Sequence, residues 1–437
     1  MSTTPRPSRA GRRRLSSAVP VTALAGCLLL TGCGGGPDDP AEPASPENTT
    51  ADGGPGEGDG EDVPHGYVEG AEETAEQQSR MVLASGAGEP VHVLDLVSEE
   101  SIPLGEAGEA GATGDGLAPI VGDGRFAHLL EGAAVRVVDS GAWTVDHGDH
   151  VHHYRAAARE VGEARATEPV AVHADTAVTA ITLADGGALL LDRSAAEDGE
   201  LAELLRIDDA DGPVLPFDGG LLVPVAGPDG AGRVEVRDRA GGPVAAPEAE
   251  CSDPAAAAVT RRGAVYVCEQ GALWFTAGGN GEPEVTALPW PEGTAEEDRP
   301  TELRHRNDGA VLAARAGDRG VWVLDLTDPV WRLWETGPAV AVNAVGENAP
   351  VLFVDPAGEL VSVDPASGEE LARTALLEPA ADGSVPAETV IEVDTQRVYV
   401  NDIAERRIHE IDARDDLRVA RVLPVEAEPR RMVVTGR

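Results

Sequence analysis

The sequence predicts an all-β fold: a β-propeller of eight, or alternatively seven, four-stranded blades. A short apolar strand followed by a polar turn recurs along residues 81–437, and long amphipathic helical patterns are missing there; residues 157–165 are the best short helix candidate. The recurring strands lie at residues 92–95, 136–139, 189–192, 234–238, 273–276, 321–325, 360–364 and 408–412. Their period is roughly 45 residues, as for a four-stranded blade. Two packed β-sandwiches would not explain this even spacing.

Residues 1–33 have the features of a lipoprotein signal peptide. Arginines precede an apolar stretch over residues 15–30, which is too short, and too interrupted by Pro20, to span a membrane stably. The segment ends in LTGC, the pattern of a lipobox, in which the cysteine becomes the lipidated mature N-terminus. A second match ends at Cys27, but three leucines follow it, whereas a polar segment follows Cys33. We therefore expect an extracytoplasmic protein, anchored to the cell membrane by a lipid on Cys33.

Residues 34–80 are predicted to form a disordered acidic tether and lead-in, and residues 81–437 the propeller. The stretch 34–64 is almost entirely Gly, Pro, Asp, Glu, Ser and Thr, and buries too little apolar surface to offset chain entropy. The whole chain has a formal net charge of −43. Such a charge repels nucleic acid and anionic lipid, so the membrane is expected as a partner only through the lipid anchor.

Two cysteines remain beyond the signal peptide, Cys251 and Cys268. Both lie in or beside strand-like sequence, separated by a plausible hairpin. The expected compartment is oxidising, and the spacing is unlike the close C-x-x-C pair of metal and redox sites. A disulfide between these two residues is therefore predicted.

Four histidines within residues 146–153 are the strongest chemical signal in the sequence. Imidazole is the commonest protein ligand for zinc and also binds copper and nickel. Alternate side chains of an extended strand share a face, so His150 and His152 should point one way and His153 the other. Gly148 permits a turn that brings His147 back to the first two. The alternative is a solvated patch of histidines without function.

A zinc centre needs three or four ligands, so we expect another strand to contribute to this cluster. His173 is the best distant candidate, because it ends a strand-like segment about one strand away. Asp146 and Asp149 could bind the metal directly, or accept the second imidazole N–H and fix the tautomer. The remaining histidines of the domain lie singly in strand-like sequence and are expected to be structural: His92, His128, His305 and His409.

At these residues the sequence resembles the AztD-type zinc metallochaperones. The resemblance rests on residues 65–73 (HGYVEGAEE) and 146–152 (DHGDHVH), with weaker support from residues 169–173, 291–294 and 317–325. It implies an extracytoplasmic β-propeller that accompanies a zinc ABC importer. Such a protein passes zinc to the importer's solute-binding protein without a covalent step.

The resemblance further implies zinc bound by His150 and His152, with a third histidine from a nearby strand, here His173. The sequence departs from the family in two ways. Residues 34–64 contain no histidine, so the chain has no mobile histidine-rich tail to pass metal along, unless His65 serves in that way. The lipid anchor also distinguishes this chain from soluble periplasmic members, and suits an envelope in which secreted proteins must be retained.

The predicted function is therefore that of a zinc-binding metallochaperone lipoprotein, and not of an enzyme. The sequence has neither the G-x-S-x-G nucleophile elbow nor the H-E-x-x-H zinc helix. Two alternatives stay open: a non-catalytic cell-surface interaction propeller, and a metal-dependent propeller hydrolase or lactonase. The candidate metal residues are His147, His150, His152, His153 and His173.

Overall fold

The structure, a computed structural model, describes residues 68, 70–86, 89–105, 119–147, 150–227, 230–279 and 282–437. The chain divides into residues 1–61 and a folded unit from Asp62 to Arg437, and all described residues belong to the second. The predictions for the signal peptide, Cys33, the tether over residues 34–64 and His65 therefore lie outside the described residues. The end of the predicted lead-in is ordered, because Glu72–Thr74 form a strand that pairs with Val151–Arg155, and the first strand of the propeller already begins at Arg80. Within the described ranges, no helix is long and apolar enough to cross a membrane.

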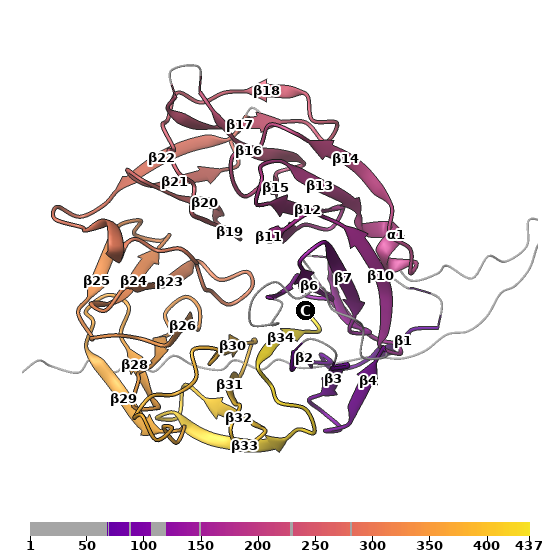
Figure 1. The fold of residues 1–437 in the computed structure, drawn as a ribbon, viewed down its shortest axis with the longest axis vertical. Coiled ribbons are helices and arrows are strands. Elements are labelled where there is room, and N and C mark those ends of the chain that lie inside the picture. Colours follow the sequence, from indigo (N-terminus) through magenta and orange to yellow (C-terminus); the bar gives the residue numbers. More distant parts are fainter. Residues whose placement is uncertain are drawn as a thin grey trace, which may run out of the picture. The chain divides into compact units, whose positions relative to one another are not determined.

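The folded unit is a ring of eight antiparallel sheets, the blades of a propeller, as Figure 1 shows. From the inside outward, blade 1 consists of β34 (Arg431–Thr435), β2 (Arg80–Ala84), β3 (Val91–Asp95) and β4 (Ser101–Leu104). Blade 2 consists of β5 (Ile120–Gly122), β6 (Phe126–Glu131), β7 (Ala134–Asp139) and β10 (Arg159–Arg165). Blade 3 consists of β11 (Pro169–Ala174), β12 (Val178–Leu183), β13 (Ala188–Asp192) and β14 (Glu203–Ile207). Blade 4 consists of β15 (Leu215–Phe217), β16 (Gly220–Ala226), β17 (Gly232–Arg237) and β18 (Pro243–Ala245).

The other blades follow the same order. Blade 5 consists of β19 (Ala256–Thr260), β20 (Gly263–Cys268), β21 (Gly271–Thr276) and β22 (Glu284–Pro289). Blade 6 has β23 (Val311–Ala316), β24 (Gly320–Asp325) and β25 (Trp331–Trp334), with an isolated bridge from Arg304 to Ala313 on its inner side. Blade 7 consists of β26 (Ala341–Ala344), β27 (Val351–Val354), β28 (Glu359–Val363) and β29 (Glu370–Ala375). Blade 8 consists of β30 (Ile391–Val393), β31 (Val398–Asp402), β32 (Arg407–Asp412) and β33 (Arg418–Pro424).

The predicted all-β propeller is confirmed, with eight blades. All eight apolar strands recognised in the sequence fall on the third strand of a blade, from β3 to β32, if the bridge at Arg304 is counted as the innermost strand of blade 6. The short helix candidate at residues 157–165 is not a helix, because Arg159–Arg165 form β10 and pair with β7 along the outside of blade 2. Described helix is limited to α1 (Arg193–Glu197) and a 3₁₀ turn at Glu296–Asp298.

Eight hydrophobic clusters hold the ring together, one between each pair of neighbouring blades. Alternation along a strand assigns its side chains to two different clusters. In β2, Met81 and Leu83 pack toward blade 8, while Val82 packs toward blade 2. The two middle strands of each blade are therefore mostly buried on both faces, which explains their nearly continuous apolar sequence.

The two ends of the propeller meet in blade 1. Strand β34 pairs antiparallel with β2, and Val82 lies opposite Val433. A strand from near the end of the chain thus completes the sheet that β2 begins, and this pairing closes the ring. The predicted disulfide is also confirmed: Cys251, in the segment before β19, is bonded to Cys268 at the end of β20.

A short extra sheet interrupts blade 2. Between β7 and β10 the chain forms a hairpin of β8 (Ala142–Asp146) and β9 (Val151–Arg155), and β9 also pairs with β1 (Glu72–Thr74). Arg80 fixes the base of this hairpin, since its Nη1 donates to the carbonyl oxygens of Ser140 and Ala156 on either side of it. The sheet β1-β9-β8 carries the histidine-rich segment.

Candidate metal centre

The register of the hairpin decides which side chains share a face. Val145 lies opposite His152 and Trp143 opposite Tyr154, and residues directly opposite each other in an antiparallel pair point to the same side. Glu73 of β1 also lies opposite Tyr154. His152, Tyr154 and Glu73 therefore lie on one face of the three-stranded sheet.

Three histidines gather on this face at the tip of the hairpin. One ligating atom from each of His147, His150 and His152 lies within 4.8 Å of the other two. A hydrogen bond from the His147 amide to the His150 carbonyl, at 3.0 Å, closes the turn and brings His147 back toward the strand. His147 and His150 are exposed and His152 is half-buried, so the cluster is open to solvent.

The donor set and its geometry fit a zinc ion. Tetrahedral zinc with bonds of about 2.0–2.1 Å holds its nitrogen ligands about 3.4 Å apart. Because the three ligating atoms already lie within 4.8 Å of one another, small side-chain rotations at the hairpin tip are enough to reach this spacing. Three imidazoles leave one coordination position for water or for a group on another molecule, as in zinc sites that exchange ligands.

A carboxylate from outside the hairpin contacts the cluster. The Nδ1 of His152 lies 2.7 Å from Oε1 of Glu73. On the same face of the sheet, the Tyr154 ring stacks on Trp143 at 5.4 Å, and the Arg125 guanidinium lies over the Trp143 ring at 3.9 Å. Burial, and then the nearby Glu73 carboxylate, raise the pKa of Tyr154. This stack fixes the orientation of the cluster relative to blade 2.

Glu73 is the residue of this site that the sequence reasoning did not single out. It lies within residues 65–73, which carry the family resemblance, but the sequence does not show that β1 pairs with β9. Pairing between strands about 80 residues apart depends on the tertiary fold. The resembling segment itself is the signal that could have identified Glu73.

His153 and Asp146 lie on the opposite face of the hairpin. His153 is opposite Thr144, and its Nδ1 lies 2.9 Å from the Thr144 hydroxyl. Burial, and then neighbouring His152, lower the pKa of His153. Asp146 is opposite Val151, which likewise assigns it to the face away from His152. The structure does not bring His153 into the three-histidine cluster, as the alternation argument predicted, and Asp149 lies outside the described residues.

His173 does not reach the cluster either, and the expectation that it would is corrected. It lies on β11, the innermost strand of blade 3, whereas the hairpin leaves blade 2 after its third strand. Its Nε2 lies 3.3 Å from the carbonyl oxygen of Ala257 on β19, the innermost strand of blade 5. Burial lowers the pKa of His173 to about 4, so its imidazole is neutral at physiological pH. His173 therefore belongs to the inner wall of the ring.

The single histidines have local partners, in keeping with structural roles. His92 Nδ1 lies 3.2 Å from the Ser101 hydroxyl and His128 Nε2 lies 3.0 Å from Asp123. His409 Nε2 lies 3.4 Å from Asp402, and His305 donates from Nδ1 to the Arg306 carbonyl at 2.8 Å.

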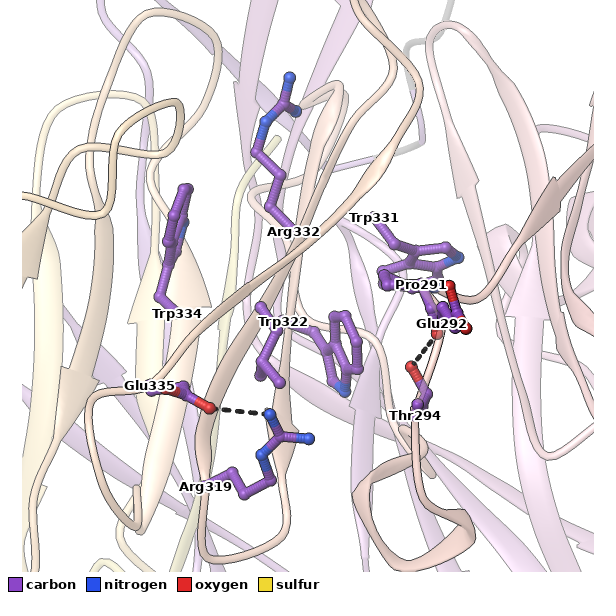
Figure 2. A pocket seen from close by; sticks show the side chains of 11 residues that line it. Pro291, Glu292, Thr294, Arg319, Trp322, Trp331, Arg332, Trp334 and Glu335 are labelled. Atoms are coloured by element: carbon purple, nitrogen blue, oxygen red, sulfur yellow. Dashed lines mark hydrogen bonds and ion pairs between the residues drawn. The ribbon is translucent and has the colours of Figure 1, made fainter.

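A separate pocket of about 550 Å³ lies between blades 5 and 6. Figure 2 shows its walls: the loop at residues 291–294, and β24 and β25 with Trp322 and Trp331. Two segments that contributed weakly to the family resemblance, 291–294 and 317–325, thus meet here. The Arg319 guanidinium donates to Glu335 at 2.8 Å, and the Thr294 hydroxyl donates to the Pro291 carbonyl. No histidine or cysteine is among its described lining residues, so it has no nucleophile with an adjacent imidazole base.

The fold and the site define a class of protein: an eight-bladed propeller with an exposed three-histidine cluster on a hairpin inserted into one blade. The chain is similar to the crystal structure of AztD from Citrobacter koseri, with a TM-score of 0.67 and 20% identity over 82% of this chain and 98% of that chain. The apo structure of the same protein gives a TM-score of 0.66 at 19% identity. No family model and no curated protein matches the sequence. The AztD-type resemblance is thus confirmed for the fold.

Proposed function

We propose that this protein binds zinc at His147, His150 and His152 and passes it to the solute-binding protein of a zinc ABC importer. The observation that carries the proposal is the convergence of three imidazoles within 4.8 Å on one face of the β8–β9 hairpin. The AztD-type fold and the sequence resemblance at residues 65–73 and 146–152 support zinc as the cargo. The zinc ion is the transported substrate, and no bond of the protein is made or broken.

The exposure of the cluster supports transfer. Two of its three histidines are exposed, so a ligand from an acceptor protein can enter the free coordination position before the last imidazole leaves. Stepwise ligand exchange of this kind avoids a free, fully hydrated ion.

Metal titration tests the binding site. Metal-free protein should take up one zinc tightly in competition with a chromophoric chelator, and His150→Ala/His152→Ala should weaken this binding at least about 100-fold, since one imidazole cannot hold the ion. His153→Ala is the matched control, from the same strand but the opposite face, and should bind as the unmodified protein does. Binding should weaken as the pH falls, because protons compete with the metal for the imidazole nitrogens. Unchanged affinity in the double variant would place the site elsewhere.

A transfer experiment tests the carrier function. Zinc-loaded protein is mixed with the metal-free solute-binding protein, or with a small chelator of equal affinity at equal concentration. Transfer to the binding protein should be faster, because direct contact replaces dissociation. Equal rates for the two acceptors would contradict the proposal, and would leave a metal-binding propeller without a dedicated acceptor.

We also propose that the protein is held at the outer side of the cell membrane by a lipid on Cys33. The support is the LTGC pattern after the apolar segment of the signal peptide. Cys33→Ala should release the protein from the membrane fraction, whereas Cys27→Ala should leave it there. The reverse result would show that Cys27 is the lipidated residue.

A further inference from the structure

We propose that Glu73 is a positioning residue of the histidine cluster, and that docking of strand β1 is energetically coupled to metal binding. This inference rests on the proposed function and adds a means of release to it. The strand immediately before the propeller would then change the zinc affinity of the histidine cluster without binding the metal itself.

The first support is the hydrogen bond between Glu73 and His152. With Oε1 of Glu73 2.7 Å from Nδ1 of His152, the ring donates its Nδ1–H to the carboxylate, which leaves Nε2 as the nitrogen of His152 that can bind a metal. A carboxylate in this position fixes the tautomer and the ring orientation and makes the imidazole a better ligand. Loss of such partners typically lowers metal affinity about 10–100-fold.

The second support is the weak attachment of β1. The strand has three residues, and Glu72 and Glu73 are exposed. Its side chains contact β9 through Glu72 with Arg155 at 2.8 Å, Glu73 with His152, and the Thr74 hydroxyl with the His153 carbonyl at 3.3 Å. The Thr74 hydroxyl also lies 2.9 Å from the Glu76 carbonyl in its own segment. The ion pair between Glu72 and Arg155 is largely exposed, so it contributes little to stability. β1 can therefore detach without disturbing the blades.

Coupling between two binding events is reciprocal. If docked Glu73 strengthens the hold of the cluster on zinc by some factor, bound zinc strengthens the docking of β1 by the same factor. Detachment of β1, for example when an acceptor protein pairs with β9 in its place, would then lower the zinc affinity of the site. In this proposal, β1 orients the metal ligand His152 only while it is paired with β9.

Glu73→Gln and Glu72→Gln form a matched pair that tests this. The two residues are neighbours on one strand, but Glu72 lies opposite Arg155 on the far face of the sheet. Zinc affinity, measured by chelator competition, should fall about 10–100-fold in Glu73→Gln and change less than about threefold in Glu72→Gln. Equal affinities in both variants and the unmodified protein would overturn the proposal.

Hydrogen exchange gives a readout that a loss of local packing would not reproduce. Zinc should slow amide exchange of the peptide containing residues 72–74 in the unmodified protein and in Glu72→Gln, and have a much smaller effect in Glu73→Gln. No zinc effect on this peptide in any of the three proteins overturns the coupling alone. Failure of the unmodified protein to bind zinc would overturn the proposed function as well.

Discussion

Asp123 joins two neighbouring blades through one buried carboxylate. It lies in the turn between β5 and β6, where Oδ1 accepts from the amides of Arg125 and Phe126. Its Oδ2 accepts from Arg193 of blade 3 and lies 3.0 Å from His128 Nε2. Burial alone would raise the pKa of Asp123, but Arg193, and then His128, outweigh it and hold the pKa well below 3.8. An equivalent contact joins blades 3 and 4, between Asp175 and Arg239.

We expect Asp123 to contribute to the loss of stability in acid. Because its pKa is lowered in the folded state, its contribution is complete above pH 3.8 and is lost as the pH falls toward its folded-state value. Asp123→Asn should cost about 3 kcal/mol at pH 7, since it removes the nearest partner charge of the buried Arg193 and leaves only Glu197, at 3.7 Å. Urea denaturation at pH 7, 5 and 3 should show this difference shrinking only at the lowest pH.

The control for this prediction is Asp318→Asn, on an exposed turn. Its denaturation midpoint should stay close to that of the unmodified protein at every pH. A cost for Asp123→Asn that is small at pH 7, or that grows as the pH falls, would contradict the assignment.

Residue by residue, the sequence predicted the part of the metal site that depends on local geometry. The alternation of His150, His152 and His153 and the turn that returns His147 are set within eight residues. The contribution of His173 could not be judged in this way. It depended on whether residues 142–155 form part of a blade or an insertion, and the spacing to β11 is compatible with both.

The eight third strands show why some elements are easy to predict and others are not. A strand such as β24 is buried on both faces, so it is a continuous apolar run that propensity alone identifies. An outer strand such as β10 mixes exposed, half-buried and buried residues, and its mixed sequence resembles an amphipathic helix. Its pairing with β7 overrides that local preference.

The Cys251–Cys268 bond links the segment before β19 to the end of β20. The bonded residues are 17 apart in sequence, and a loop of this size is worth about 3 kcal/mol by restricting the unfolded chain. Cys251→Ser/Cys268→Ser should lower the free energy of unfolding by about this amount in a denaturant titration. The reduced unmodified protein should show a similar loss. Coincident curves for the oxidised protein and the variant would contradict the expectation.

On the scale of the whole molecule, stability depends on the closure of the ring at blade 1. Eight inter-blade clusters form a closed circle only because β34 supplies the inner strand beside β2. Val433 of β34 packs into the cluster between blades 1 and 2 and is 8% exposed. Each blade thus packs against a neighbouring blade on both of its faces.

Val433→Asp should open this junction. A buried carboxylate without a partner costs at least about 3 kcal/mol, and the change should lower the melting temperature by several degrees. Val422→Asp, on the outer strand β33 where the valine is 46% exposed, is the matched control. It should shift stability by less than about 0.5 kcal/mol. Similar melting temperatures for the two variants would show that closure contributes little.

The hydroxyl of Thr435 donates to the carbonyl of Arg80 across a separation of 355 residues, at this same junction. Within each blade, by contrast, neighbouring strands are joined mostly by short turns. The entropy of closing a loop grows with its length, so the hairpins should form early and the junction last. In the native state, the contacts that form last during folding should be the first to break. Transient opening should therefore begin at the pairing of β34 with β2. Amide exchange along β34 would then measure how often the entire ring opens.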